Sequence, residues 1–160
     1  MPKKYECIGQ VIVGSGGASA ISFTSIPSTY TDLRIELSLR RDNAYDRRVV
    51  QMTFNSASSG YSDRGYLGGQ LGGGVNISFY DTPANTGVAN TFSSNSIYIP
   101  NYTSSSYKSV SIESVGDQYF DMVGATSNVT SAITTISFDT GQGGNWVQNS
   151  SAYLYGISKS

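Results

Sequence analysis

Histidine is absent from this 160-residue chain, and cysteine occurs only once. Without histidine there is no imidazole base, no Ser-His-Asp or Cys-His nucleophilic arrangement and no histidine-containing zinc site. The single cysteine, Cys7, forms no disulfide within the chain, and no neighbouring base in the sequence is placed to activate its thiol. We therefore interpret Cys7 as a small buried apolar residue of the first strand, and we expect a non-enzymatic protein without metal or cofactor.

Charge is also scarce. Charged residues make up 13% of the chain and the net charge is −1, whereas ordinary soluble domains contain about 25% charged residues. There is neither a basic stripe nor an acidic tail, so the sequence gives no electrostatic indication of nucleic-acid binding. A surface with so little charge is kept in solution by Ser, Thr and Asn, or it is covered by partner subunits. The second possibility favours an assembly.

Long apolar runs are missing too. A lysine pair precedes the apolar stretch 8–13, but Gly9, Gln10 and Gly14 interrupt it well short of the hydrophobic region of a signal peptide. No run approaches the roughly 20 apolar residues of a transmembrane helix. We expect one domain over residues 1–160, made and folded in the cytoplasm without membrane insertion. At this length, folding removes about 70% of the unfolded chain's surface from water.

What the chain does contain is sheet-forming sequence. In the segment 33–40 the four aliphatic residues Leu33, Ile35, Leu37 and Leu39 alternate with Arg34, Glu36, Ser38 and Arg40. This period of two places the aliphatic set on one face of a half-buried strand. Further runs rich in β-branched and aromatic residues are bounded by Gly, Ser, Asn, Asp or Pro. The expected strands are 5–13, 18–24, 33–40, 49–54, 75–80, 91–98, 107–115, 119–126, 133–138 and 152–157.

This series of short strands predicts an all-β domain. No stretch has the apolar spacing of an amphipathic helix. Many short strands form a two-sheet sandwich or a closed barrel, and long connections mixed with tight turns favour a jelly-roll-like sandwich. The segment 55–74 has no clear strand pattern, and long irregular connections in small domains are usually functional or disordered. We expect this segment to be an interface loop.

Two motifs invite a catalytic or phosphate-binding interpretation. The run Phe138–Gly141 (FDTG) matches the signature around the catalytic carboxylate of aspartic proteases, which work with two such carboxylates. Only nineteen residues follow Gly141, too few for the flap and second structural motif of those enzymes. A strand end followed by a turn explains the run better. The glycine-rich run Gly65–Gly74 lacks the Lys-Ser/Thr pair of a phosphate loop, so we expect a flexible or closely packed loop.

Two sets of residues are candidates for contacts with a partner. The segment 40–48 contains Arg40, Arg41, Arg47 and Arg48 around two aspartates, which is typical either of a solvated turn or of a docking loop whose guanidinium groups bind carboxylates. Tyr61 and Tyr66 belong to a tyrosine-rich middle third of the chain. Tyrosine offers flat apolar area with a polar tip, which suits a protein-contact or sugar-stacking face, although half-buried strand positions explain these residues equally.

Four blocks of the sequence also carry a family resemblance. They are Tyr5–Val13 (YECIGQVIV), Ile21–Arg40 (ISFTSIPSTYTDLRIELSLR), Ile97–Ser109 (IYIPNYTSSSYKS) and Ser151–Ile157 (SAYLYGI). Together they resemble a group of small β-rich proteins of tailed bacteriophages, many of which infect aquatic bacteria. The resemblance implies a virion structural protein displayed on the exterior of the particle, and it supplies no catalytic residues.

Within that class we expect a capsid decoration or cement protein, because the sequence contains no coiled-coil, collagen-like or β-helical shaft of a fibre. We expect it to act as a homotrimer. Its partners would be copies of itself and other virion proteins. A tail-fibre or baseplate appendage is the first alternative, with the sandwich as a host-recognition tip or adaptor. A carbohydrate-binding module that binds a host-surface glycan is the second.

Overall fold

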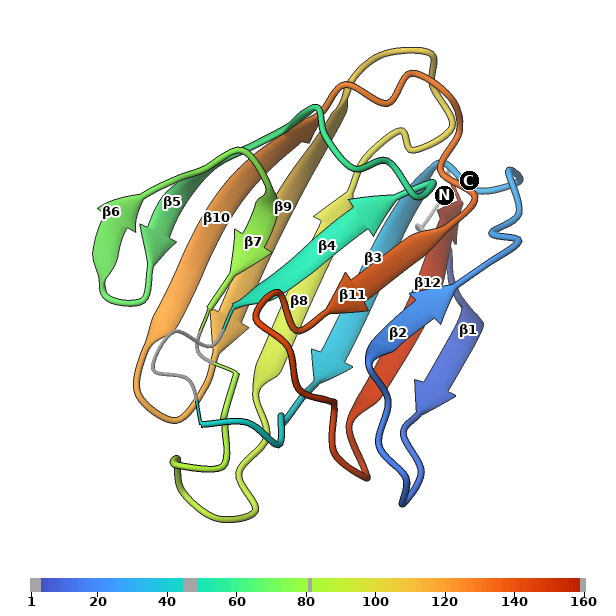
Figure 1. Ribbon diagram of the computed structural model, residues 1–160. Helices are drawn as coiled ribbons and strands as arrows, with labels where there is room; N and C mark the ends of the chain where they lie inside the picture. Colours follow the sequence, from blue (N-terminus) through green and yellow to red (C-terminus); the bar gives the residue numbers. More distant parts are fainter. Residues whose placement is uncertain (1–3, 45–48, 81, 159–160) are drawn as a thin grey trace.

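The computed structural model describes residues 4–44, 49–80 and 82–158, and in this part of the chain all regular structure is β (Figure 1). Two antiparallel sheets pack face to face, as the sequence predicts. The strands are β1 (Lys4–Ile12), β2 (Ala20–Phe23), β3 (Asp32–Ser38), β4 (Val50–Phe54), β5 (Tyr61–Leu67), β6 (Gln70–Gly72), β7 (Ile77–Phe79), β8 (Ser94–Ile99), β9 (Lys108–Val115), β10 (Phe120–Ser127), β11 (Ile136–Asp139) and β12 (Ser151–Ser158).

Eight of these strands form nested antiparallel pairs. β1 pairs with β12, β2 with β11, β3 with β8 and β4 with β7. Two more pairings, β12 with β3 and β11 with β4, join the nested pairs side by side. The chain thus behaves as one long hairpin rolled up so that alternate pairs enter opposite sheets, and this is the jelly-roll sandwich that the sequence favours.

The larger sheet is wider than the smaller one because four added strands extend it. The hairpin β9–β10 continues the large sheet beyond β8, and the hairpin β5–β6 pairs onto β10, which gives the order β1-β12-β3-β8-β9-β10-β5-β6. The smaller sheet ends at β7, in the order β2-β11-β4-β7. In Figure 1, β5 and β6 lie past β7 at one end of the molecule. We call β9, β10, β5 and β6 the extension.

The segment 55–74 corrects one expectation. It is not an irregular loop, because half of it forms β5 and β6. Its strand pattern is hidden in the sequence because Asp63 faces inward while Tyr66 faces outward. Gly65 stands where a Cβ would lie 2.2 Å from the carbonyl oxygen of Met122, so β5 needs a residue without a side chain there. The other ten strands agree with the sequence-based ranges to within three residues.

The core lies between the two sheets and follows the predicted alternation. Leu33, Ile35 and Leu39 are 0% exposed and Leu37 is 4% exposed, while the residues between them are half-buried on the other face. From the smaller sheet, large apolar side chains complete this core. The principal ones are Ile21, Phe23, Met52, Phe54, Ile77, Phe79, Ile136 and Phe138.

Two buried carboxylates hold the extension against β7. Asp63 of β5 is 3% exposed and accepts hydrogen bonds from the backbone N–H groups of Gly74 and Ser78, the latter at 3.0 Å. Asp121 of β10 is 1% exposed and accepts from the N–H groups of Gly68, at 2.7 Å, and Tyr80. Each carboxylate therefore joins a strand of the extension to a turn or to the edge of the smaller sheet.

Substituting Leu37 tests the core. We expect Leu37→Ala to lower the free energy of unfolding by about 2–5 kcal/mol, because it leaves a cavity between the sheets. Glu36→Ala, on the opposite face of β3, should cost at most about 1 kcal/mol, since its ion pair with Arg34 is half-exposed. Urea denaturation of both variants measures the difference. Equal midpoint shifts would contradict the orientation of β3.

Substituting Asp63 tests the attachment of the extension. Asp63→Ala leaves the buried N–H of Ser78 without its acceptor, at a cost of about 1–3 kcal/mol, and removes one of the two acceptors of the Gly74 N–H. Asp42→Ala is the matched control, because Asp42 also accepts a backbone N–H, that of Asn145 at 2.7 Å, but is exposed. Hydrogen exchange should show that Asp63→Ala exposes the amides of β5 to β7 first. Uniform loss of protection across both sheets would contradict a local role.

Candidate assembly face

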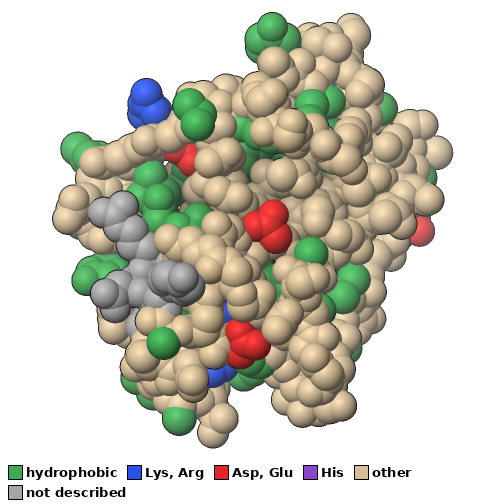
Figure 2. All heavy atoms as spheres, viewed as in Figure 1, with side chains coloured by type: hydrophobic (Ala, Val, Ile, Leu, Met, Phe, Trp, Pro, Cys, Tyr) green, Lys and Arg blue, Asp and Glu red, His purple; other side chains and the backbone are tan. Residues whose placement is uncertain are grey.

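The face of the large sheet that points away from the smaller sheet is the best candidate for a functional surface. Along β9 and β10 the burial alternates strictly, so every second residue belongs to this outer face. By the strand register, the outer face spans residues from all eight strands of the large sheet. The opposite side of the molecule, in front in Figure 2, shows mostly uncharged polar and backbone atoms with a few scattered charged side chains.

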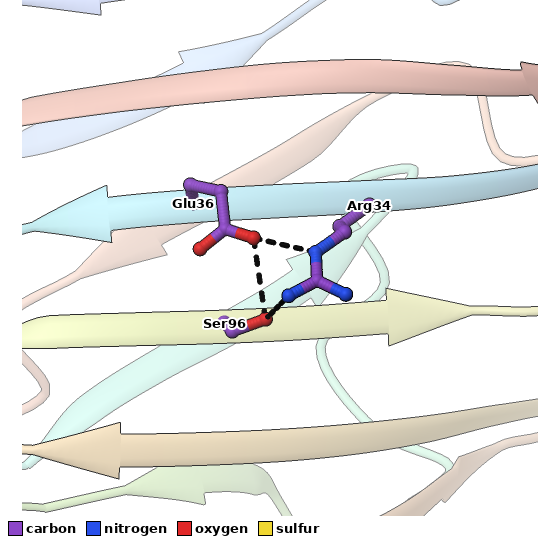
Figure 3. A network of polar contacts seen from close by, with 3 residues as sticks. All are labelled: Arg34, Glu36 and Ser96. Atoms are coloured by element: carbon purple, nitrogen blue, oxygen red, sulfur yellow. Dashed lines mark hydrogen bonds and ion pairs between the residues drawn. The ribbon is translucent and has the colours of Figure 1, made fainter. Parts of the chain in front are cut away.

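A polar network occupies the centre of the outer face (Figure 3). Arg34 Nε donates to Glu36 Oε1 at 2.5 Å, and Arg34 Nη2 donates to Ser96 Oγ at 2.7 Å. Ser96 Oγ in turn donates to Glu36 Oε1 at 3.3 Å. The hydrogen bond to Glu36 raises the pKa of Arg34. The network orients the side chains of Arg34 and Glu36. The ion pair remains accessible to solvent, since the two side chains are 41% and 40% exposed.

Tyrosines surround this network. Tyr155 and Tyr98 lie opposite Arg34 on the neighbouring strands β12 and β8, and Tyr153 lies opposite Glu36. The Tyr98 hydroxyl donates to Asp32 Oδ2 at 2.8 Å, while the other oxygen of Asp32 accepts from the Asn101 N–H. Burial, together with the hydrogen bond to Asp32, raises the pKa of Tyr98 to about 12.

An apolar strip covers the outer face of the extension. We define it as Tyr66, Leu71, Val115, Phe120 and Met122. These side chains are contiguous by register: Val115 pairs with Phe120, Met122 with Tyr66, and Tyr66 with Leu71. The rings of Tyr66 and Phe120 stack with centroids 5.3 Å apart. Their exposure ranges from 37% for Tyr66 to 87% for Leu71, so the strip is an apolar patch open to solvent.

Only Tyr66 of the strip is among the contact residues proposed from the sequence. The other proposed tyrosine, Tyr61, belongs to the core: it is 6% exposed, packs edge-on against Phe54 and accepts the Phe54 N–H through its hydroxyl. Strand alternation alone would have grouped Phe120 with Met122, but nothing in the sequence assigns that group to the outside. Their outward orientation follows from the burial of Asp121 between them.

The arginine cluster of residues 40–48 is divided by the structure. Arg41 is 0% exposed, and its guanidinium donates to the carbonyl oxygens of Val49, Thr140 and Gly143. Arg40 is half-buried and donates to the carbonyl oxygens of Val88 and Thr91. These two arginines therefore join loops within the domain, and Arg41 is not in a solvated or docking turn. Arg47 and Arg48 lie outside the described residues.

The remaining motifs have structural explanations. Asp139 Oδ1 accepts the Gly141 N–H at 2.7 Å, which is the strand-end turn expected for the FDTG run. In the glycine-rich run, Gly68 and Gly69 adopt positive φ angles of 55° and 85° and form the turn between β5 and β6. Cys7 does belong to the first strand, but it is exposed rather than buried.

Metal ions and membrane-spanning helices are two further possibilities for the described residues. Residues 4–44, 49–80 and 82–158 contain no group of three His, Cys, Asp or Glu side chains close enough to hold a metal ion. No helix among them is long and apolar enough to cross a membrane.

Comparison with known proteins adds little. No protein-family model and no curated protein matches the chain. Among solved structures, a fructofuranosidase variant from Schwanniomyces occidentalis in complex with fructosylnystose aligns with 8% identity and a TM-score of 0.24. The alignment covers 99% of this chain and 33% of the enzyme, so the chain spans about a third of that protein's length. A likeness at this level carries no argument about function.

The raised pKa of Tyr98 predicts a stability change at alkaline pH. Tyrosine is neutral when protonated, and a folded-state pKa above the ordinary value of 10.0 favours the protonated form in the folded protein. This contribution to stability is complete below pH 10 and is lost as the pH rises toward about 12. Tyr98→Phe should therefore lose less stability than the wild type over this window. Parallel curves of melting temperature against pH for the two proteins would refute the assignment.

Proposed function

We propose that this protein is a non-enzymatic structural component on the exterior of a tailed-bacteriophage particle, where it associates with itself and with other virion proteins. Two sequence features support the proposal: the resemblance of the four blocks to phage structural proteins, and a surface with very little charge. A compact jelly-roll domain is compatible with such a role but does not select it, because one fold serves many functions.

The observation that carries the proposal is the position of the apolar strip. All five of its residues belong to the extension and none to the eight nested strands that make the jelly roll. On a monomer in water, the exposed apolar area of five neighbouring side chains adds no stability and favours aggregation. Contiguous apolar patches on soluble proteins mark contacts with other macromolecules. The added strands are therefore best explained as a platform for assembly.

Within this function, a capsid decoration or cement subunit is preferred to a tail appendage. The described residues form one compact sandwich, and the sequence contains no fibrous repeat that would project a tip from the particle. A glycan-binding role would use a different region, the centre of the outer face, where Tyr98, Tyr153 and Tyr155 border the pair of Arg34 and Glu36.

Copy number on purified particles tests the proposal. Quantitative mass spectrometry of intact particles, and of capsid-free tails from the same preparation, should find this protein in a fixed ratio to the major capsid protein and absent from the tails. Particles that lack it should release their genome at lower temperature than wild-type particles. A few copies that copurify with tails would support the tail alternative, and its absence from both fractions would refute a virion role.

A further inference from the structure

We infer that the apolar strip is the contact surface for a second copy of this chain, related to the first by a two-fold axis that runs along β10. The inference deepens the self-association in the proposed function and rests on it, with a two-fold pair in place of the homotrimer expected from the sequence. Three features of the extension support the inference: the position of its charged residues, the area of its outer face and the burial of the residues behind the strip.

The charges lie on opposite sides of β10. On the outer face, Glu113 of β9 lies beside Met122 of β10, while Arg64 of β5 lies beside Gly124, two residues further along β10. Both Arg64 and Glu113 are exposed. The outer face therefore carries an acidic residue on one neighbour of β10 and a basic residue on the other, with Met122 and Gly124 of β10 between them.

A two-fold axis along β10 makes these two residues complementary. Rotation by 180° about that axis places β9 of each copy over β5 of the other, so Glu113 faces the strand that carries Arg64 of the second copy. The two residues are offset along the strands by two positions, or about 7 Å, which long Arg and Glu side chains bridge. An axis perpendicular to β10 would instead place β9 over β9 and β5 over β5, so that like charges meet. The charges thus select both a copy of the chain and its orientation.

The available area supports a modest interface. The five strands from β8 to β6 are spaced by about 4.8 Å and average about 22 Å in length, so each copy offers roughly 500 Å² and the pair buries on the order of 1,000 Å². This is near the lower limit for a specific contact between proteins. We therefore expect a dimer that forms with rising protein concentration rather than a permanent one.

The platform is rigid enough to dock without rearrangement. Directly behind the strip, Ile112 and Val123 are buried at 1% and 4% exposure, and Asp121 is held by the N–H groups of Gly68 and Tyr80. Because Tyr66 and Phe120 already stack on one another, little side-chain entropy remains to be lost when they are covered.

Sedimentation equilibrium over a range of concentrations tests this inference. The wild-type chain of 17.1 kDa should convert to a species of twice that mass as its concentration rises. Met122→Glu should weaken the dimer by at least about 30-fold, because it places an unpaired charge in the contact. The matched control is Ile12→Glu, since Ile12 is 57% exposed, against 59% for Met122, and lies on β1 at the other edge of the same sheet. The control should dimerise like the wild type.

A charge exchange tests the orientation. Arg64→Glu and Glu113→Arg should each weaken the dimer, and the double variant should restore it, with thermal unfolding monitored to confirm that every variant folds. A wild-type protein that stays monomeric, a trimeric species, equal effects of Met122→Glu and Ile12→Glu, or a double variant that is not restored would each overturn the inference. A monomer that is nevertheless present on particles would refute only this inference. A dimer absent from particles would refute the virion role and leave the dimer standing.

Discussion

The buried carboxylates of Asp63 and Asp121 are the interaction on which the wide part of the large sheet depends. Beyond β7 the smaller sheet ends, so the inner face of the extension has less apolar surface to pack against than the rest of the large sheet. The two carboxylates compensate by accepting backbone N–H groups from β7 and from the adjoining glycine turns. Charged acceptors make stronger hydrogen bonds than neutral ones. They therefore stabilise a region that apolar packing alone would leave weak.

The nested topology explains why an extension of this kind is tolerated. In a chain rolled up as one long hairpin, the connections between β4 and β7 and between β8 and β11 leave the jelly roll at the same end of the large sheet, and each contains one of the added hairpins. The two hairpins meet where β10 pairs with β5. Insertions far apart in sequence thus complete each other's hydrogen bonding, and on this side the described part of the large sheet ends in the three-residue strand β6. A short edge offers few free backbone groups for unwanted strand addition.

The sequence was a good guide where apolar and polar residues alternate cleanly, as in β3, and a poor one where functional and structural demands are mixed. In β10, both alternating sets contain apolar residues. The set that includes Asp121 is the buried one, because the Asp121 carboxylate accepts hydrogen bonds from backbone N–H groups. Arg41 is likewise a charged residue that is buried, since its guanidinium donates to three backbone carbonyl oxygens, one from Val49 and two from the turn 140–143. Such partners come from distant parts of the chain, and local patterns cannot reveal them. Composition alone points to Tyr66, and it does not identify the residues that neighbour Tyr66 in the strip.

A weak contact between copies is consistent with a role on a particle. If the protein binds a capsid lattice through another surface, neighbouring subunits are held at a high effective concentration, and an interface of modest area is then sufficient to join them. In dilute solution the same interface stays largely open, and because a two-fold contact closes on itself, it joins no more than two free subunits before they reach the particle. The opposed charges of Arg64 and Glu113 contribute mainly to orientation, because exposed ion pairs add little affinity but make misaligned pairings unfavourable. Different side chains of the same sheet thus meet the two requirements: the apolar strip provides association, and one charge of each sign on either side of β10 provides specificity.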